Sequence, residues 1–189
     1  MPKSVLMRIG DLDFDSKNSM VRITVNGNFP ETKLAGLCVG PFEEGNEYEV
    51  PYWIGRVLEK GGIAHFRKEE CLDAGKLFKI QWKERAQTAG QMSSLSDDFY
   101  PKLRRYVAEL KEASVKAPER MREYETIMHL ARDIVNSRLR KIIALASSPT
   151  QTEQIAKNLT GEERFLHDHL SNLINNWRKQ ILEYEGTEE

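Results

Sequence analysis

Residues 40–54 constrain the fold of this chain more than any other segment, because fixed backbone positions are followed by an abrupt change of pattern. Pro41 fixes its own φ angle, whereas Gly40 and Gly45 allow backbone angles that other residues rarely adopt. The run starts Gly-Pro-Phe-Glu-Glu-Gly-Asn, which is the composition of a turn. The segment therefore predicts a defined turn ahead of the elements that follow.

The second half of this segment predicts a short strand that passes directly into a helix. Residues 47–50 alternate charged and apolar side chains, with Tyr48 and Val50 on one face. Pro51 suits the first turn of a helix, where its missing N–H costs nothing. We expect the helix to span residues 52–60 and to end at the Gly-Gly pair that follows. The inward side of this helix is predicted to carry Trp53, Val57 and Leu58.

The first 66 residues are rich in predicted strands. Residues 21–25, Val-Arg-Ile-Thr-Val, alternate apolar and polar side chains as a half-buried strand does. The Asn-Gly-Asn run at 26–28 is a turn signal typical of hairpins. Further strands are predicted at residues 33–39, 48–50 and 63–66. These short strands and one helix indicate a small β-rich domain over residues 1–67, a size that is marginally stable alone.

From Arg67 onward the pattern changes to that of helices. Residues 68–86 place four apolar side chains at spacings of three and four, which indicates one stripe along a helix. The stripe comprises Cys71, Ala74, Phe78 and Trp82. Residues 87–96 have loop composition, and we expect them to be flexible. The sequence thus predicts an α+β fold, with a small N-terminal β-rich domain followed by a mainly α-helical bundle over residues 68–189.

Three more helices are predicted beyond this loop. The first starts near Asp97 or Asp98, and the second opens at Pro118 and continues to about residue 147. At 1.5 Å per residue the second is about 45 Å long, so we expect part of its apolar surface to meet a partner. Thr160-x-x-Glu163 is a capping box that starts the last helix. Their stripes comprise Phe99, Leu103, Tyr106, Val107 and Leu110; Met121, Tyr124, Met128, Ala131, Ile134, Val135, Leu139, Ile142 and Leu145; and Leu166, Leu170, Leu173, Ile174, Trp177, Ile181 and Tyr184.

The residue content argues against an enzyme, a metalloprotein or a membrane protein. The net charge is −1, which gives no global attraction to DNA or membranes. The two cysteines, Cys38 and Cys71, form no C-x-x-C pair, and we expect both to be buried in a reducing compartment. No phosphate loop, nucleophile motif or metal-ligand spacing occurs, and no apolar run reaches the roughly 18 residues of a membrane span. We therefore expect no catalytic residue, no cofactor and no metal site.

Basic residues gather on two of the predicted helices. The cluster comprises Arg104, Arg105, Arg138, Arg140 and Lys141. Three interpretations remain open for these side chains: solvated polar faces, contacts with nucleic acid, or ion pairs buried between subunits.

The last helix carries an aromatic anchor. Trp177 lies between Leu173 and Ile181 at helical spacing, and tryptophan is enriched among interface hot spots. The predicted subunit interface comprises Leu166, Leu170, Leu173, Trp177 and Ile181. Packing of the same residues within the chain's own bundle is the alternative.

Residues 40–54 resemble the "GPF … G … V-E-V-P-x-W" signature of the GINS replication proteins, in the subunits that place their small β-domain first. The matching positions, to which we assign a structural role, are Gly40, Pro41, Phe42, Gly45, Val50, Pro51 and Trp53. The domain order, Phe99-Tyr100-Pro101 and the long helix over 130–145 support the resemblance. The short chain with compact loops is similar to the archaeal form.

The resemblance implies a non-catalytic subunit of a DNA replication assembly, in the cytoplasm beside the nucleoid or in a nucleus. The expected partners are an α-domain-first GINS subunit in a 2:2 heterotetramer, the MCM helicase, a RecJ-like or Cdc45-like protein, and in some species primase or polymerase. It implies no cofactor and only weak or indirect DNA contact. The alternative is a stand-alone nucleic-acid-binding module that uses the basic helix faces.

Overall fold

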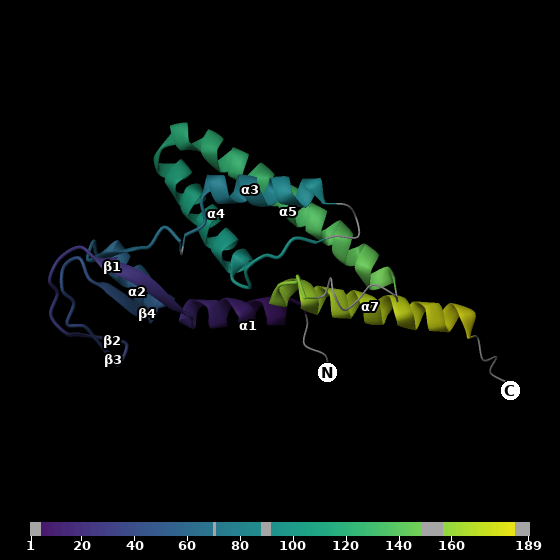
Figure 1. Ribbon diagram of the computed structural model, residues 1–189, viewed down its shortest axis with the longest axis horizontal. Coiled ribbons are helices and arrows are strands. Elements are labelled where there is room, and N and C mark those ends of the chain that lie inside the picture. The colour runs from purple at the N-terminus through teal and green to yellow at the C-terminus, as the bar shows by residue number, and fades with distance from the viewer. Residues whose placement is uncertain (1–4, 70, 88–91, 149–156, 184–189) are drawn as a thin grey trace. The chain divides into compact units, whose positions relative to one another are not determined.

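The computed structural model describes residues 5–69, 71–87, 92–148 and 157–183, and the chain divides into two compact units. One unit covers Gly10–Asp73, and the other includes the chain from Ala74 onward (Figure 1). Strands occur in the first unit and a bundle of helices makes up the second, which confirms the predicted α+β class. An N-terminal helix, α1 (Val5–Asn18), precedes the first strand and was not expected from the sequence.

The smaller unit is built on a three-stranded antiparallel sheet in the order β4-β1-β5. Its strands are β1 (Met20–Val25), β4 (Glu47–Pro51) and β5 (Ala64–Phe66). In β1 the alternate residues Val21, Ile23 and Val25 are buried. Val21 is paired with Val50, and Ile23 is paired with Tyr48 on one side and Phe66 on the other. The central predicted strand is therefore confirmed, and its period of two builds the core face.

The Gly-Pro-Phe turn places an aromatic side chain in this core. Gly40 has a φ of +98°, and a Cβ there would lie 3.3 Å from the Cα of Glu31. Both facts favour glycine at this position. Phe42 is buried and meets Tyr48 edge to face, with ring centroids 4.9 Å apart. Turn and strand are thus held together by a packed aromatic pair.

Helix α2 (Tyr52–Lys60) has the predicted bounds but presents a different inward side. Ile54, Gly55 and Leu58 are buried, and Trp53 is half-buried against the same core. Val57 is 48% exposed, so its predicted inward position is wrong. The helix contacts the sheet through positions 54 and 58, which share one face.

Two further expectations for this unit are corrected. Residues 33–39 form a hairpin of β2 (Thr32–Leu34) and β3 (Leu37–Val39), and not one strand, because Ala35 and Gly36 both have positive φ. Cys38 and Cys71 are exposed rather than buried.

Helix α5 is the central element of the helical unit. It spans Met121–Ser147 and packs against α3 (Ala74–Ala86), α4 (Phe99–Lys116) and α7 (Gly161–Leu182), as Figure 1 shows. A short 3-10 turn, η1 (Pro118–Arg120), joins α4 to α5. The buried apolar side chains of α4 and α5 include Phe99, Leu103, Leu110, Ile127, Leu130, Ile134 and Ile142. The four helices are confirmed, although α3 begins six residues later than the predicted start at 68.

The segment before α4 contributes to the core. Met92 is buried in a cluster with Ile142, Leu145 and Leu159, against which Leu166 and Leu170 pack. Ser93 is buried as well. Residues 92–96 form neither helix nor strand, as a loop does, although Met92 and Ser93 are packed into the core. Residues 88–91 lie outside the described part of the chain, and the flexibility of the segment stays a prediction.

Truncating Leu58 should destabilise the small unit far more than truncating Val57 of the same helix. Leu58→Ala removes buried methyl groups and should cost about 2 to 5 kcal/mol of unfolding free energy. Val57→Ala changes a side chain that is half in solvent and should stay within about 0.5 kcal/mol. Chemical denaturation of both variants checks this, and equal costs would contradict the observed inward side of α2.

Candidate functional site

A fully buried arginine lies at the centre of the helical unit. Arg138 is 0% exposed and occupies the middle of α5, one turn from each of the buried residues Ile134 and Ile142. A guanidinium has five N–H donors and no acceptor, so burial is tolerable only when acceptors surround it. The site is defined by how these donors are satisfied.

All five donors of Arg138 find oxygen acceptors. Its Nε donates to Glu163 Oε1 at 2.7 Å, and one Nη2 hydrogen goes to Glu163 Oε2, which makes a bidentate pair. Its Nη1 donates to Glu84 Oε1 at 2.9 Å and to the Ser93 carbonyl at 2.6 Å. The remaining Nη2 hydrogen reaches the Asn158 carbonyl at 3.1 Å. The guanidinium therefore has no donor left for an outside ligand.

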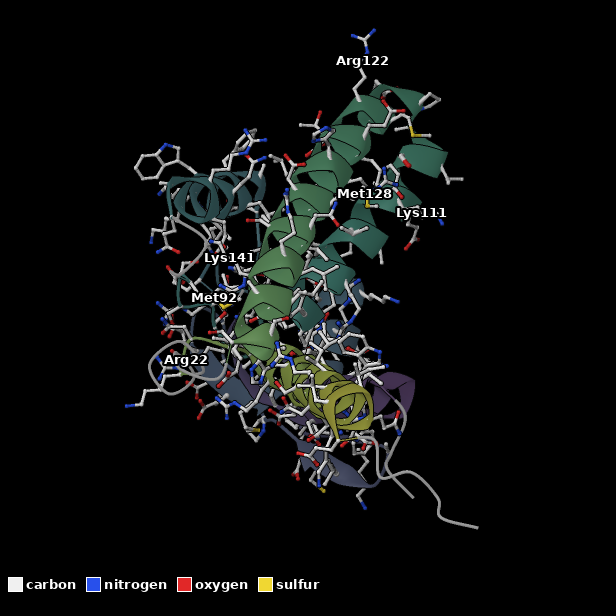
Figure 2. The ribbon with its side chains drawn as sticks, turned by 90° about the vertical axis from the view of Figure 1, so that its right-hand side faces the viewer. Arg22, Met92, Lys111, Arg122, Met128 and Lys141 are labelled. Carbon is white, nitrogen blue, oxygen red and sulfur yellow. The ribbon has the colours of Figure 1, made fainter. Side chains whose placement is uncertain are left out.

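Glu84 of α3 forms the second half of the network. It is 1% exposed, and its Oε2 accepts from Lys141 Nζ at 2.7 Å, while the same ammonium donates to the Glu84 carbonyl at 3.1 Å. Ser93 donates its hydroxyl to Glu84 Oε1. Figure 2 shows Lys141 and Met92 on the side of α5 that is turned toward α3. Through these contacts α3 and the segment after it are fixed to α5.

Glu163 serves two functions at the start of α7. It completes the predicted capping box: its backbone N–H donates to Thr160 Oγ1, and its Oε2 accepts from the Thr160 N–H at 3.1 Å. It also accepts from Arg138 and, at 2.7 Å, from the hydroxyl of Tyr100 on α4. One carboxylate thus joins three helices.

The buried charges balance within the network. Arg138 and Lys141 supply two positive charges, and Glu84 and Glu163 supply two negative charges. Burial pushes the pKa of Glu84 upward, but hydrogen bonds from Lys141 and Ser93 and the charge of Arg138 outweigh it and lower that pKa. Burial also raises the pKa of the Tyr100 hydroxyl, and the nearby Glu163 charge adds to the rise. Glu84 is therefore charged and the Tyr100 hydroxyl is neutral near pH 7.

This arrangement is suited to holding helices together. Each carboxylate is already bound by two or more donors, and each cation by its carboxylates, so the groups stabilise one another. The sequence indicates the site only in part: Thr160 and Glu163 appear as a capping box, and Arg138 as one member of the predicted basic cluster. Glu84 gives no local signal, and Tyr100 appears only as part of the Phe99-Tyr100-Pro101 run that supports the resemblance.

The predicted basic cluster is divided by the structure. Arg138 and Lys141 are buried and paired within the chain, so neither is available to DNA or to another subunit, which corrects that expectation. Arg104 Nη2 lies 3.6 Å from Glu162 Oε1. Arg140 Nε donates to the carbonyl of Asn136 on its own helix. Arg105 is half-buried and also has a polar or electrostatic partner.

The predicted apolar stripes are divided as well. Leu166 and Leu170 pack against the Met92 cluster, whereas Leu173, Trp177 and Ile181 are 67%, 61% and 61% exposed. On α3 the expected stripe faces outward, with Phe78 51% and Trp82 70% exposed.

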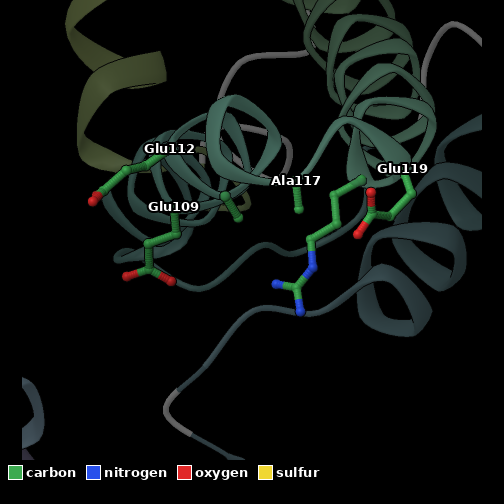
Figure 3. Close-up of a pocket in the computed structure, with 6 residues that line it drawn as sticks. Glu109, Glu112, Ala117 and Glu119 are labelled. Atoms are coloured by element: carbon green, nitrogen blue, oxygen red, sulfur yellow. The ribbon is translucent and has the colours of Figure 1, made fainter.

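A hollow of about 400 Å³ at the junction of α4 and η1 is lined by Glu109, Glu112, Ala113, Ala117, Glu119 and Arg120 (Figure 3). Within the described ranges, no group of three or more His, Cys, Asp or Glu side chains is placed to hold a metal ion. None of the described helices combines the length and apolarity needed to cross a membrane.

Comparison with known proteins identifies the bundle that surrounds this network. Residues 71–182, more than half of the chain, match the family described as Sld5, GINS complex protein helical bundle domain. The chain belongs to the GINS family. It is also 27% identical over 157 residues to the Homo sapiens protein "DNA replication complex GINS protein PSF2", a match that covers 82% of this chain and 80% of the human protein. Every member of the network, from Glu84 to Glu163, lies inside the GINS bundle match.

Removing the central arginine should destabilise the GINS bundle severely. Arg138→Met keeps much of the volume but leaves Glu84 and Glu163 buried without their main partner, which should cost about 3 to 5 kcal/mol. Arg140→Met, on the exposed side of the same helix, is the matched control and should stay within about 0.5 kcal/mol. Urea denaturation compares the two, and similar costs would contradict the role of the network.

The network should also make stability depend on acid. A glutamate titrates near 4.5 when unfolded, and the pKa of Glu84 is lower in the folded chain. Its stabilisation is therefore fully present above pH 4.5 and is lost as pH falls through the folded pKa. The stability gap between wild type and Glu84→Gln should therefore shrink as pH falls below 4.5. Denaturation at several pH values measures this gap, with the exposed Glu119→Gln as control; a gap constant with pH would refute the linkage.

Proposed function

We propose that this chain is the β-domain-first subunit of a GINS assembly and acts in DNA replication as a structural component, without catalysis of its own. Support comes from the order of elements, in which the strands precede the helical bundle, and from the similarity to PSF2. The compact, archaeal-like character of the chain belongs to the same proposal.

The observation that carries the proposal is the outer stripe of α7. Leu173, Trp177 and Ile181 recur every four residues, so they lie along one side of the helix, and all three are more than half exposed. Contiguous exposed apolar side chains are unusual on an isolated protein and mark contact surfaces. Leu182, 81% exposed, is a further apolar side chain at the end of α7, but it points about 100° away from Ile181 and so lies outside the stripe.

Helix α5 supports the same interpretation. Val135, Leu139 and Ile143 also recur every four residues and are 39%, 37% and 44% exposed. Helices α5 and α7 are in contact, and Arg178 of α7 donates to the Ser147 carbonyl at the end of α5 at 2.7 Å. Two adjoining helices of the bundle therefore each present an apolar row. We propose that these rows meet other GINS subunits.

The full assembly we propose is a 2:2 heterotetramer with an α-domain-first GINS subunit. In this proposal the tetramer bridges the MCM helicase and a RecJ-like or Cdc45-like protein and, in some species, contacts primase or polymerase. It works in the cytoplasm beside the nucleoid, or in the nucleus of a eukaryotic cell. Hydrophobic subunit contacts of this kind often make a chain unstable as a free monomer.

A stand-alone nucleic-acid module built on the basic cluster is less favoured. Arg138 and Lys141 are already paired within the buried network, and Arg104 lies beside Glu162. What remains of the cluster is too small to supply the main function of the chain.

Complex formation with an α-domain-first GINS subunit tests the proposal. Light scattering on size-exclusion chromatography should give about four chains for the mixture, and a poorly behaved sample for this chain alone. Trp177→Ala should weaken assembly by at least about 2 kcal/mol, or roughly thirtyfold, because it removes an aromatic anchor. Leu173→Asp should abolish assembly by placing a charge in the interface.

The control is Asn175→Asp, which adds the same charge on a different side of α7 and should leave assembly intact. A stable monomer that does not associate with the partner would overturn the proposed function. Normal assembly by both stripe variants would instead place the interface elsewhere on the bundle.

A further inference from the structure

The outer face of α3 combines exposed aromatic rings with exposed lysines. Leu77 and Glu84 point into the bundle, which turns Phe78 and Trp82 outward, 51% and 70% exposed. These two rings are four residues apart, so they lie one above the other at a rise of about 6 Å. Lys79 and Lys83 follow them in sequence at the same spacing, and both are exposed. The face therefore carries a row of rings beside a row of ammonium groups.

The α3 face carries positive charge, because no acidic side chain in the described part of the chain is paired with its two lysines. Glu84 is the only acidic residue of α3, and it is buried against Arg138 and Lys141. Arg85 is paired with Asp133 at 2.8 Å, so it contributes little net charge. Neither Lys79 nor Lys83 has an ion-pair partner in the described ranges of the chain. The two lysines are thus available to an external anion.

We propose that the α3 face, formed by Phe78, Lys79, Trp82 and Lys83, binds single-stranded nucleic acid. Bases stack on the two rings while the lysines contact phosphates of the same strand. The binding is independent of sequence, because every base offers a π-face and every nucleotide offers a phosphate. This activity goes beyond the subunit role proposed above and uses a different helix of the bundle.

Comparison with α7 explains the choice of occupant. The α7 stripe has one ring, Trp177, between the aliphatic side chains of Leu173 and Ile181, and suits an apolar protein surface. The two large apolar side chains that α3 exposes, Phe78 and Trp82, are both aromatic and have lysines beside them. Lysine is depleted in the cores of protein interfaces. Surfaces that bind single-stranded nucleic acid usually combine aromatic rings with cationic side chains. The chemistry of α3 therefore matches a polyanion with flat rings.

Fluorescence anisotropy with a labelled oligothymidylate of about 20 nucleotides tests the proposal. The full chain is used, in complex with its GINS partner if it is insoluble alone. Trp82→Ala should weaken binding about tenfold, since one stacking platform is lost. The double variant Lys79→Glu with Lys83→Glu should weaken binding at low salt and flatten the plot of log K against log salt by about 1.4, two phosphates at about 0.7 each.

Two exposed residues of α4 provide matched controls. Lys111 lies on the opposite side of α5 from α3 (Figure 2), and Val115 is 78% exposed. Lys111→Glu and Val115→Ala should leave oligothymidylate affinity unchanged, and circular dichroism should show the same helicity for every variant. Binding that is lost in the α3 variants and kept in the controls supports the proposal.

Three outcomes would overturn it. The first is no oligothymidylate binding at low salt, or equal losses in the α3 and α4 variants. The second is displacement of the oligonucleotide by poly-glutamate at equal charge concentration, which would indicate an acidic protein as the ligand. The third is loss of subunit assembly in Trp82→Ala, which would make α3 a subunit contact.

Discussion

The bundle depends on placing one guanidinium where no water can reach it. Arg138 donates to α3 and α7 carboxylates and to two backbone carbonyls, so elements far apart in the sequence must be in position before its desolvation is compensated. Apolar packing alone would allow the helices to slide, because many registers bury similar area. Directional hydrogen bonds to a rigid planar group select one register.

The network also explains why the aromatic face of α3 is turned outward. The helix has one side with Phe78 and Trp82 and another with Leu77 and Glu84, and only one can face α5. Leaving Arg138 and Lys141 without Glu84 would cost several kcal/mol, more than the gain from burying one ring against a polar partner. Because Arg138 and Lys141 of α5 need Glu84 as their partner, they decide which side chains of α3 remain on the surface.

Local sequence patterns predict much of the fold, and the predictions that fail do so for one common reason. The strand at residues 21–25, the helix over 52–60 and the Thr160 capping box each follow from patterns within a few residues. The inward side of α3, the burial of Arg138 and the role of Tyr100 depend on partners 25 to 63 residues away. Hydrophobic periodicity ranks Trp82 above Glu84 for burial, and only knowledge of the opposing cations reverses that order. The sequence identifies the α7 stripe as apolar. Which part of it is covered, as Leu166 and Leu170 are, and which part is exposed depends on the positions of the neighbouring helices.

The double use of Glu163 has a consequence for association. Because Glu163, the second residue of the α7 capping box, is also held by Arg138, the first turn of α7 cannot fray or pivot without breaking the buried centre. The outer stripe of α7 is thus presented by a helix whose direction is set before any encounter. Little conformational entropy remains to be lost when a surface docks on it, so the affinity of such a contact is limited mainly by shape complementarity.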